Sequence, residues 1–575
     1  MYSLALRRLV VVVSTAALSG CSSDSEQTPV EVVDVAQDAE VSDLNDDDLQ
    51  DDALDTAEAG PDAPEPDVDV EDLSADSQDV ADSVQDVVPD TERDAGQPVP
   101  FPPSLEVAWT ATGEKHVFSS PRLVHIDDDG VLDIIFGTGV EKYVVDEEAN
   151  AIVALSGATG EPLWTTPARY ELVGTATLGD LNNDGIEDAV IGGRNGELLA
   201  VSTHDGSVIW QWETGSNPLV FGWLNFSTPQ IIADRNGDGY PEVVATNGGN
   251  GAAPPFEPRP AGELLLLSGA DGAILWRGQM PDGAETYMTP LVHNNGQEDV
   301  LLVGTGGETL PGSLWSLPLA SFDAAPETAE WQLVLSGDGR GIMAPPVLAD
   351  LNNDGILDIV VSAFLETTTV VDGATYEPLW AHRIENHESY TTPGIGYFDG
   401  DDVPDVFVCY MRGVYPTYTG GAVAVLSGVD GTPILEQPMF EYFPWNSAIT
   451  LDLDQGGRTD VLIAGSATTG LADTPNTADL WMYRGETNEM VLLREMPGTS
   501  MSTPAVADLD GDGRIELIAA SFQGFFVRLE GDGYWQVERV DLGEASPTSG
   551  VFGYLGQNSE STFPGTPQRG YQRTP

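Results

Sequence analysis

From residue 101 onward the chain alternates short apolar runs with polar segments rich in aspartate, asparagine and glycine. A typical run, DAVI at residues 188–191, is too short for a stable helix, and many runs are rich in β-branched residues. Short β-branched runs between such segments favour buried strands over helices. The pattern therefore predicts an all-β domain over residues 101–541, followed by a tail rich in glycine, serine and proline at residues 542–575.

The polar segments are copies of one loop. Clear copies begin at Asp180, Asp234, Asp350 and Asp508, weaker copies at His125, Tyr397 and Asp452, and a much altered copy at His293. The starts lie 47 to 59 residues apart. A repeat of this length is typical of proteins built by stacking one small supersecondary unit many times.

Each repeat carries a second motif, in which a strand and a tight turn are followed by tryptophan, as at Trp164, Trp210, Trp276 and Trp380. Asp-Gly and Thr-Gly pairs at these turns are typical of β-hairpins. One repeat thus predicts about four antiparallel strands, which bury both faces only when stacked in a ring. We expect a β-propeller of eight blades, or of seven if one repeat is split. The segment at residues 105–109 could close the ring by pairing into the last blade, although residues 534–540 compete for that place.

The complete loop has the form D-x-[DN]-x-D-G-x-x-[DE]. Calcium prefers six to eight oxygen ligands. Positions 1, 3 and 5 supply side-chain oxygens, the glycine at position 6 permits a left-handed bend, position 7 can supply a carbonyl, and position 9 a closing carboxylate. An EF-hand closes instead at position 12, between helices.

Four complete loops therefore predict four calcium sites. Their candidate ligands are Asp180, Asn182, Asp184, Ile186 and Asp188; Asp234, Asn236, Asp238, Tyr240 and Glu242; Asp350, Asn352, Asp354, Ile356 and Asp358; and Asp508, Asp510, Asp512, Arg514 and Glu516. Three partial loops leave metal binding and a plain turn equally open. Their acids are Asp127, Asp129 and Asp133; Asp399, Asp401 and Asp405; and Asp452, Asp454 and Asp460.

The N-terminal segment, residues 1–20, has the pattern of an export signal, with Arg7 and Arg8 before a short apolar stretch. It ends in LSGC, which resembles the bacterial lipobox and implies a lipid on Cys21. Residues 24–100 contain 27 acidic residues and one basic residue, Arg93. Such a segment cannot offset its ordering entropy by burial, so residues 21–100 predict a disordered, extended linker that follows the lipidated cysteine.

The Asp loops resemble the FG-GAP/VCBS repeats, the propeller type also found in integrin α-subunit heads. The resemblance covers roughly residues 105–541 and implies structural calcium between the first two strands of a blade, with ligands bound on another face. The tryptophan motif also resembles the repeats of quinoprotein (PQQ) dehydrogenases, which form eight-bladed propellers. That likeness makes a quinone-dependent dehydrogenase the main enzymatic alternative, and a polysaccharide-degrading propeller enzyme the second.

Few residues favour either enzyme. Histidine occurs six times, and the closest pair, His382 and His387, fits a solvated outer strand better than a catalytic site. Cys409 follows an apolar run and fits a core position. The net charge of −72 disfavours nucleic acid and anionic surfaces as partners.

We expect an outer-membrane lipoprotein of the bacterial cell envelope that faces the periplasm or the exterior. In this interpretation it is held to the membrane by its lipid, and it uses a calcium-stabilised propeller as a binding, adhesion or scaffold module for a protein or glycan.

Overall fold

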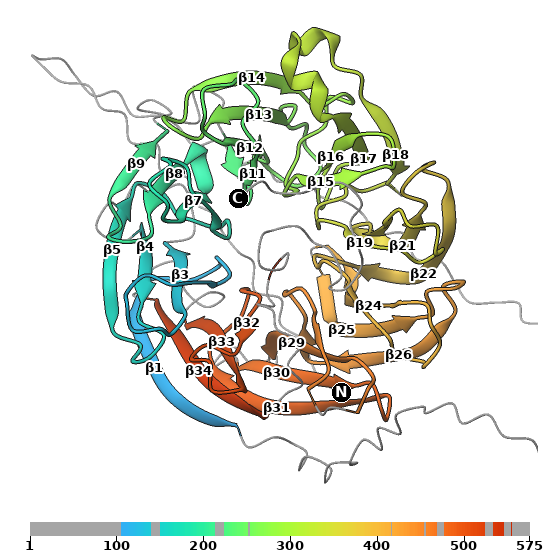
Figure 1. Ribbon diagram of the computed structural model, residues 1–575. Helices are drawn as coiled ribbons and strands as arrows, with labels where there is room; N and C mark the ends of the chain where they lie inside the picture. The colour runs from blue at the N-terminus through green and yellow to red at the C-terminus, as the bar shows by residue number, and fades with distance from the viewer. Residues whose placement is uncertain are drawn as a thin grey trace, which may run out of the picture. The chain divides into compact units, whose positions relative to one another are not determined.

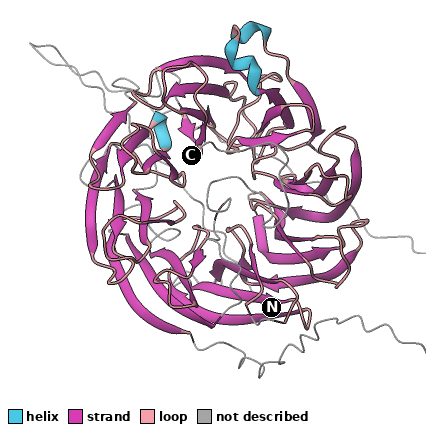
Figure 2. Cartoon of the chain, in the orientation of Figure 1, coloured by secondary structure: helices cyan, strands magenta, loops and turns pink. Residues whose placement is uncertain are grey.

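The computed structural model describes residues 105–139, 150–212, 224–250, 253–337, 339–415, 417–453, 456–467, 477–523, 533–544 and 554. In this part the chain consists of strands and loops plus three short 3-10 helices, η1 (Arg194–Gly196), η2 (Leu319–Asp323) and η3 (Pro326–Thr328) (Figure 2). No helix of the described part is long and apolar enough to span a bilayer. The predicted signal segment, Cys21, the acidic linker and all of the tail except residues 542–544 and 554 lie outside the described residues.

The strands form eight antiparallel units, each with its first strand innermost and its fourth outermost (Figure 1). In units 3 and 7 the first strand consists of two segments, β10 and β11 or β27 and β28, that pair with the same second strand. The first four units are the following: unit 1, β2 (Arg122–Val124), β3 (Asp133–Thr138), β4 (Asn150–Leu155) and β5 (Pro162–Ala168); unit 2, β6 (Thr177–Gly179), β7 (Asp188–Gly192), β8 (Leu198–Ser202) and β9 (Val208–Gln211); unit 3, β10 (Asn225–Phe226), β11 (Gln230–Ile232), β12 (Glu242–Gly248), β13 (Glu263–Ser268) and β14 (Ile274–Gln279); unit 4, β15 (Leu291–Asn294), β16 (Asp299–Gly304), β17 (Ser313–Pro318) and β18 (Gln332–Ser336).

The other four units complete the described strands. They are the following: unit 5, β19 (Val347–Ala349), β20 (Asp358–Ser362), β21 (Leu365–Val371) and β22 (Pro378–Glu388); unit 6, β23 (Gly394–Gly396), β24 (Asp405–Val414), β25 (Thr417–Leu426) and β26 (Pro433–Phe440); unit 7, β27 (Tyr442–Phe443), β28 (Ile449–Leu451), β29 (Asp460–Ala467), β30 (Thr477–Arg484) and β31 (Glu489–Pro497); unit 8, β32 (Ala505–Ala507), β33 (Arg514–Gln523), β34 (Tyr534–Glu544) and β1 (Glu106–Glu114). Units 5 and 6 share one sheet because the end of β22 pairs with β24.

The hydrophobic core lies between the units. Each of the eight buried clusters of the described part is made by two neighbouring units. One of them places Phe136 of unit 1 with Phe522 of unit 8, so the series of interfaces returns to its start. The sheets are therefore arranged as a closed ring, and the fold is a β-propeller, as the repeat predicts.

The ring is closed by strands from both ends of the domain. β1 pairs with β34 from Glu106 opposite Asp541 to Glu114 opposite Tyr534. The two segments that seemed to compete for one place in the sequence thus hold different places, β34 as the third strand of unit 8 and β1 as the fourth.

Repeated tryptophans join one unit to the next at five of the eight junctions between the described units. The indole N–H donates to a backbone carbonyl of the following unit from Trp109, Trp164, Trp210, Trp276 and Trp380, at 2.7 to 3.2 Å. A buried tryptophan combines a large apolar area with one donor that needs a partner. The turn of the next unit supplies that partner, which explains why tryptophan recurs at this position.

The antiparallel order sorts the connections onto two faces. Loops between first and second strands, and hairpins between third and fourth strands, lie on one face, which we call the aspartate face. Loops between second and third strands, and connections between units, lie on the opposite face. The predicted metal loops therefore all belong to one face.

Candidate metal sites in the repeated loops

Every Asp loop connects the first and second strands of its unit. The loop at residues 180–188, for example, connects β6 to β7, and its last acid is the first residue of β7. The acid at position 9 of the motif begins the second strand in six units and lies inside it in unit 8, where Glu516 is the third residue of β33. This placement fixes the end of the loop to the rigid part of the blade.

The position-9 carboxylate is buried and closes the loop on itself. It accepts the backbone N–H of the residue at position 2, at 2.7 to 3.0 Å, in seven loops. These acids are at most 3% exposed: Asp133, Asp188, Glu242, Asp358, Asp405, Asp460 and Glu516. Since a buried carboxylate must be compensated, these hydrogen bonds make it a structural residue even before any metal binds.

Its second oxygen ties the loop to the neighbouring hairpin. In four units it accepts the N–H of the glycine after the third strand, namely Gly157, Gly373, Gly428 and Gly485, at 2.9 to 3.2 Å. Sequence reasoning missed this contact. The signal was present as the glycine that follows the strand of the tryptophan motif, as in LSG and VDG.

The acids at positions 1 and 5 are held by backbone N–H groups of their own loop. Asp180 accepts the N–H of Asp184 at 3.1 Å and that of Gly185 at 2.9 Å, and Asp184 accepts the N–H of Ile186 at 2.8 Å. The loops of units 3, 5 and 8 repeat these contacts in part. The loop thus gathers oxygens on its inner side.

Two residues per complete loop adopt the left-handed conformation. Besides the expected position 6, position 4 has a positive φ, with values of 60° at Asn183, 80° at Gly237, 58° at Asn353 and 73° at Gly511. Glycine and asparagine tolerate this conformation best. Position 4 is therefore part of the motif, and its residue type in the four complete loops was an available but unused signal.

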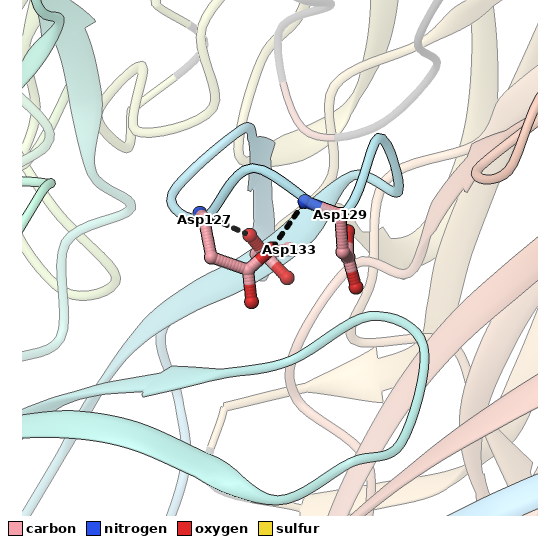
Figure 3. A group of neighbouring side chains, drawn as sticks. All are labelled: Asp127, Asp129 and Asp133. Atoms are coloured by element: carbon pink, nitrogen blue, oxygen red, sulfur yellow. Dashed lines mark hydrogen bonds between the residues drawn. The ribbon is translucent and has the colours of Figure 1, made fainter.

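Three acidic triads of the described part have ligand oxygens within 4.8 Å of one another. They are Asp127, Asp129 and Asp133 (Figure 3); Asp399, Asp401 and Asp405; and Asp508, Asp510 and Glu516. Two of these belong to partial loops whose metal binding was left open, with histidine or tyrosine at position 1. A divalent cation fits such a donor set, because hard oxygens suit calcium and their mutual repulsion is relieved by it.

In the other three complete loops, position 3 is asparagine. The amide nitrogen of Asn182 faces Asp188 at 3.4 Å, and that of Asn236 faces Asp238 at 2.9 Å. Asn352 donates to Asp354, Asp358 and Asp372 at 2.9 to 3.3 Å. In each of these loops the amide of position 3 therefore donates to an acid of the same loop, and in the loop of unit 5 it donates to two. Of the four complete loops, only that of unit 8 brings three carboxylates of the described part within 4.8 Å of one another. In the loop of unit 7, Asp454 lies outside the described residues.

Burial raises the pKa of position-9 acids above that of an exposed carboxyl group. Loss of solvent raises the pKa of Asp188 and of Asp358 to about 6, and the nearby acids Asp184 and Asp180 add to the effect at Asp188. The pKa values of Asp133, Asp405, Glu242 and Glu516 are raised for the same first reason. A bound cation would favour the charged form and reverse this shift.

The remaining candidates lie apart from the loops. His382 Nε2 is 2.9 Å from Glu436 on β26 of the next unit, whereas His387 Nδ1 lies 2.8 Å from the carbonyl of Glu385. The two histidines have different partners along β22, in keeping with the expected outer strand. Cys409 is 1% exposed and packs in the core between units 6 and 7, where burial raises the pKa of its thiol.

A protein-family model described as "Outer membrane protein assembly factor BamB" matches residues 106–352. Among curated proteins, the chain is similar to human protein FAM234B, with 31% identity over 211 residues. That match covers 35% of this chain and 30% of FAM234B, so the chain matches less than a third of that relative's length.

Similar solved structures include the quinohemoprotein alcohol dehydrogenase of Comamonas testosteroni, at 14% identity, with 78% of each chain covered and a TM-score of 0.48. BamB of Moraxella catarrhalis is 15% identical, with 76% of this chain and 99% of that chain covered and a TM-score of 0.41.

Proposed function

We propose that this chain is a lipid-anchored protein of the bacterial cell envelope whose calcium-stabilised propeller serves as a binding or scaffold module. The lipid would be carried by Cys21 and the partner would be a protein or a glycan. The observation that carries the proposal is the repetition of the Asp loop, one per unit, on a single face of the ring. The matching family model, described as an outer membrane assembly factor, supports a scaffold role in the envelope.

The distribution of the acids supports a structural role for the metal. The loops lie between the first two strands of successive units, so their carboxylates are spread around the ring instead of converging on one reacting group. In four units the loop also binds its own hairpin through the position-9 acid. A cation in such a loop would stabilise one blade.

Calcium titration of thermal unfolding tests the metal part of the proposal. Extracellular calcium modules have dissociation constants of about 10⁻⁴ to 10⁻³ M. At about 10 mM calcium, each occupied site then stabilises the fold by about 1.4 to 2.7 kcal/mol. The triple variant Asp180→Ala, Asp350→Ala and Asp508→Ala should lose most of the calcium-dependent rise in melting temperature.

The matched control changes the same charge on the same face. Asp205, Asp271 and Asp430 are exposed acids of the third-to-fourth-strand hairpins, and each accepts one N–H of its own turn. Their triple alanine variant should keep the full calcium response. If both triple variants lost the calcium-dependent rise in melting temperature equally, calcium would be acting as a general counterion for an acidic protein. The site assignment would then be wrong.

An assay for turnover of a bound ligand distinguishes the binding role from the enzymatic alternatives. A binding module should return a retained glycan intact, as measured by mass spectrometry of the recovered ligand. Shortened or unsaturated products would favour a polysaccharide-degrading enzyme, and dye reduction that requires added quinone would favour a dehydrogenase.

A further inference from the structure

The face opposite the Asp loops carries a polar and aromatic cluster that the metal loops do not explain. We define the opposite-face cluster as Arg259, Glu308, Glu388, Tyr390, Tyr418 and Trp445. They lie on connections between second and third strands or between units, or at the adjoining strand ends, and they come from units 3 to 7. Residues so far apart in the sequence share this place only because the ring brings their connections together.

A continuous hydrogen-bond chain runs through the cluster. The Tyr390 hydroxyl is 2.8 Å from Glu308 Oε1 and 2.9 Å from the Tyr418 hydroxyl, which is 2.6 Å from Glu388 Oε2. Glu388 Oε2 also accepts the backbone N–H of Tyr415 at 2.9 Å. Two carboxyl groups are thus linked through two phenols.

The hydrogen-bond chain needs one more proton than its two phenol hydroxyls provide. Three hydrogen bonds require three hydrogens, and two hydroxyls supply two, so one carboxyl group must carry the third. Glu388 is 0% exposed, whereas Glu308 is partly exposed. Burial raises the pKa of both carboxyl groups, while Arg259 favours the charged form of Glu308 and Arg340 favours that of Glu388. The hydrogen-bond chain therefore holds one proton between the two carboxyl groups, and Glu308 is the acceptor at its outer end.

The cluster is close to electrical neutrality once this proton is counted. Glu285 lies 3.4 Å from Arg259 and is hydrogen-bonded by Tyr287 at 3.0 Å. Arg340 favours the charged form of Glu388 through space and lies over the ring of Phe256. Glu285 and the ionised member of the Glu308–Glu388 pair carry two negative charges, which two arginines balance. Neutral surroundings favour an uncharged ligand over a cationic or anionic one, although the chain as a whole is strongly acidic.

Aromatic rings border the carboxyl groups. Trp445 packs against Tyr390 at 5.1 Å and Tyr418 at 6.3 Å between ring centroids, and all three side chains are partly exposed. Phe364, fully buried, supports Tyr390 from below at 4.9 Å. A partly exposed aromatic surface beside fixed acceptors offers both an apolar face and hydrogen bonds.

Two buried polar atoms of the cluster, Glu388 Oε1 and Arg259 Nε, have no hydrogen-bond partner among the described residues. The other oxygen of Glu388 has two partners, Tyr415 and Tyr418. A buried oxygen without a donor is costly and calls for an explanation, which a ligand or a water that reaches it would supply. This atom is the independent sign that the cluster does more than fill space.

We propose that the opposite-face cluster binds an uncharged, hydroxyl-rich oligosaccharide. The apolar face of a sugar ring would pack on Trp445, while Glu308 accepts a hydroxyl hydrogen and Arg259 donates to a hydroxyl oxygen. The Tyr390–Tyr418–Glu388 chain holds Glu308 in position. This inference rests on the proposed binding role and names its face and its ligand class.

Isothermal titration calorimetry of the full-length protein in the presence of calcium tests this proposal. The probes are cellohexaose, xylohexaose, mannohexaose and chitohexaose, with hexagalacturonate and hexalysine as charged comparators. At least one uncharged hexasaccharide should bind with a dissociation constant below about 1 mM, a range reached by few contacts. Trp445→Ala and the isosteric Glu308→Gln should each weaken binding at least about tenfold. Val429→Ala removes an exposed apolar side chain from a third-to-fourth-strand hairpin of the aspartate face and should leave binding unchanged.

Each other outcome overturns the inference. The inference is wrong if none of the four uncharged probes binds at about 10 mM. It is also wrong if a charged comparator binds more tightly and the two variants abolish that binding, or if both variants leave binding of the uncharged probe intact. Glu308→Gln covers the case in which Trp445→Ala fails to fold. The calcium response of the same samples is measured in parallel, so that failure of this site is distinguished from failure of the calcium-stabilised propeller.

Discussion

Arg539 Nη2 lies 2.5 Å from Asp510 Oδ2, so the acidic loop of unit 8 already contains a cation of the protein's own. The same guanidinium is 3.5 Å from Glu516, and its other terminal nitrogen donates to the carbonyl of Gly157 in unit 1 at 3.1 Å. Arg539 thus neutralises one metal loop and also joins the last unit to the first. Its position on β34 gives it both roles.

Replacement of Arg539 by leucine should therefore create a stronger dependence on calcium. Without metal, the loss of the buried cation leaves Asp510 and Glu516 uncompensated, and we expect the free energy of unfolding to fall by about 3 kcal/mol. Added calcium should restore part of it. Chemical denaturation with and without chelator measures both values.

The matched control for this variant is Arg383→Leu, which breaks an ion pair with Glu366 in which the arginine is 62% exposed. Exposed pairs contribute about 0 to 1 kcal/mol. An Arg539 variant that behaves like the Arg383 variant would show that the unit 8 loop does not depend on its internal cation.

The position-9 acid should be costly to remove even in the absence of metal. Asp358 accepts the N–H groups of Leu351, Asn352 and Gly373. Asp358→Ala leaves these buried donors without an acceptor, so we expect a loss of about 2 to 4 kcal/mol in chelator. Asp358→Asn keeps an acceptor and should lose less. Equal stability of the alanine variant and the parent in urea unfolding would contradict the structural role.

The pH dependence of stability should differ between the metal-free and the calcium-loaded protein. The pKa of Asp188 and of Asp358 is raised to about 6 in the folded protein. Between about pH 4 and 6 the folded state therefore binds more protons than the unfolded state, and the free energy of unfolding falls as pH rises through this window. Calcium requires the charged carboxylates, so it should stabilise the protein more as pH rises.

Melting curves from pH 4 to 7, in chelator and in calcium, should therefore diverge with increasing pH. The double variant Asp188→Asn and Asp358→Asn is expected to flatten the slope in chelator. Parallel curves in the two conditions would show that these carboxylates are not linked to the metal.

The proposed lipid anchor predicts a simple change of location. With Cys21→Ala, a bacterium that exports the full chain should release it from the membrane fraction, because the proposed site of the anchoring acyl chains is lost. Fractionation and immunoblotting measure the change, with Cys409→Ala as the control cysteine variant. Retention of the Cys21 variant in the membranes would remove the basis for the anchor.

The sequence predicted the periodic part of this molecule and missed most of what is not periodic. Alternation and repeat spacing revealed the strands, the units and the Asp loops, because each is encoded within a few neighbouring residues. Position 4 of the loop was missed because its constraint is a backbone angle, visible only as a preference for asparagine or glycine.

Arg539 and the opposite-face cluster could not be predicted in the same way. Arg539 meets Asp510 from 29 residues away, and Glu308 meets Tyr390 from 82 residues away. Neither contact recurs among the described residues of the other units, so no pattern marks it. Only the closed ring determines which of these connections become neighbours.

The strand that closes the ring is also the strand by which the chain enters it. β1 begins at Glu106 and is held by its pairing to β34 along the outer edge of unit 8. Any tension applied through the residues before Glu106, as by a tethered chain in a moving fluid, is therefore delivered first to the seam of the propeller. The ladder between β1 and β34 and the contact of Trp109 with Gly157 would be the first interactions to bear that load, so this seam is where we expect the propeller to open.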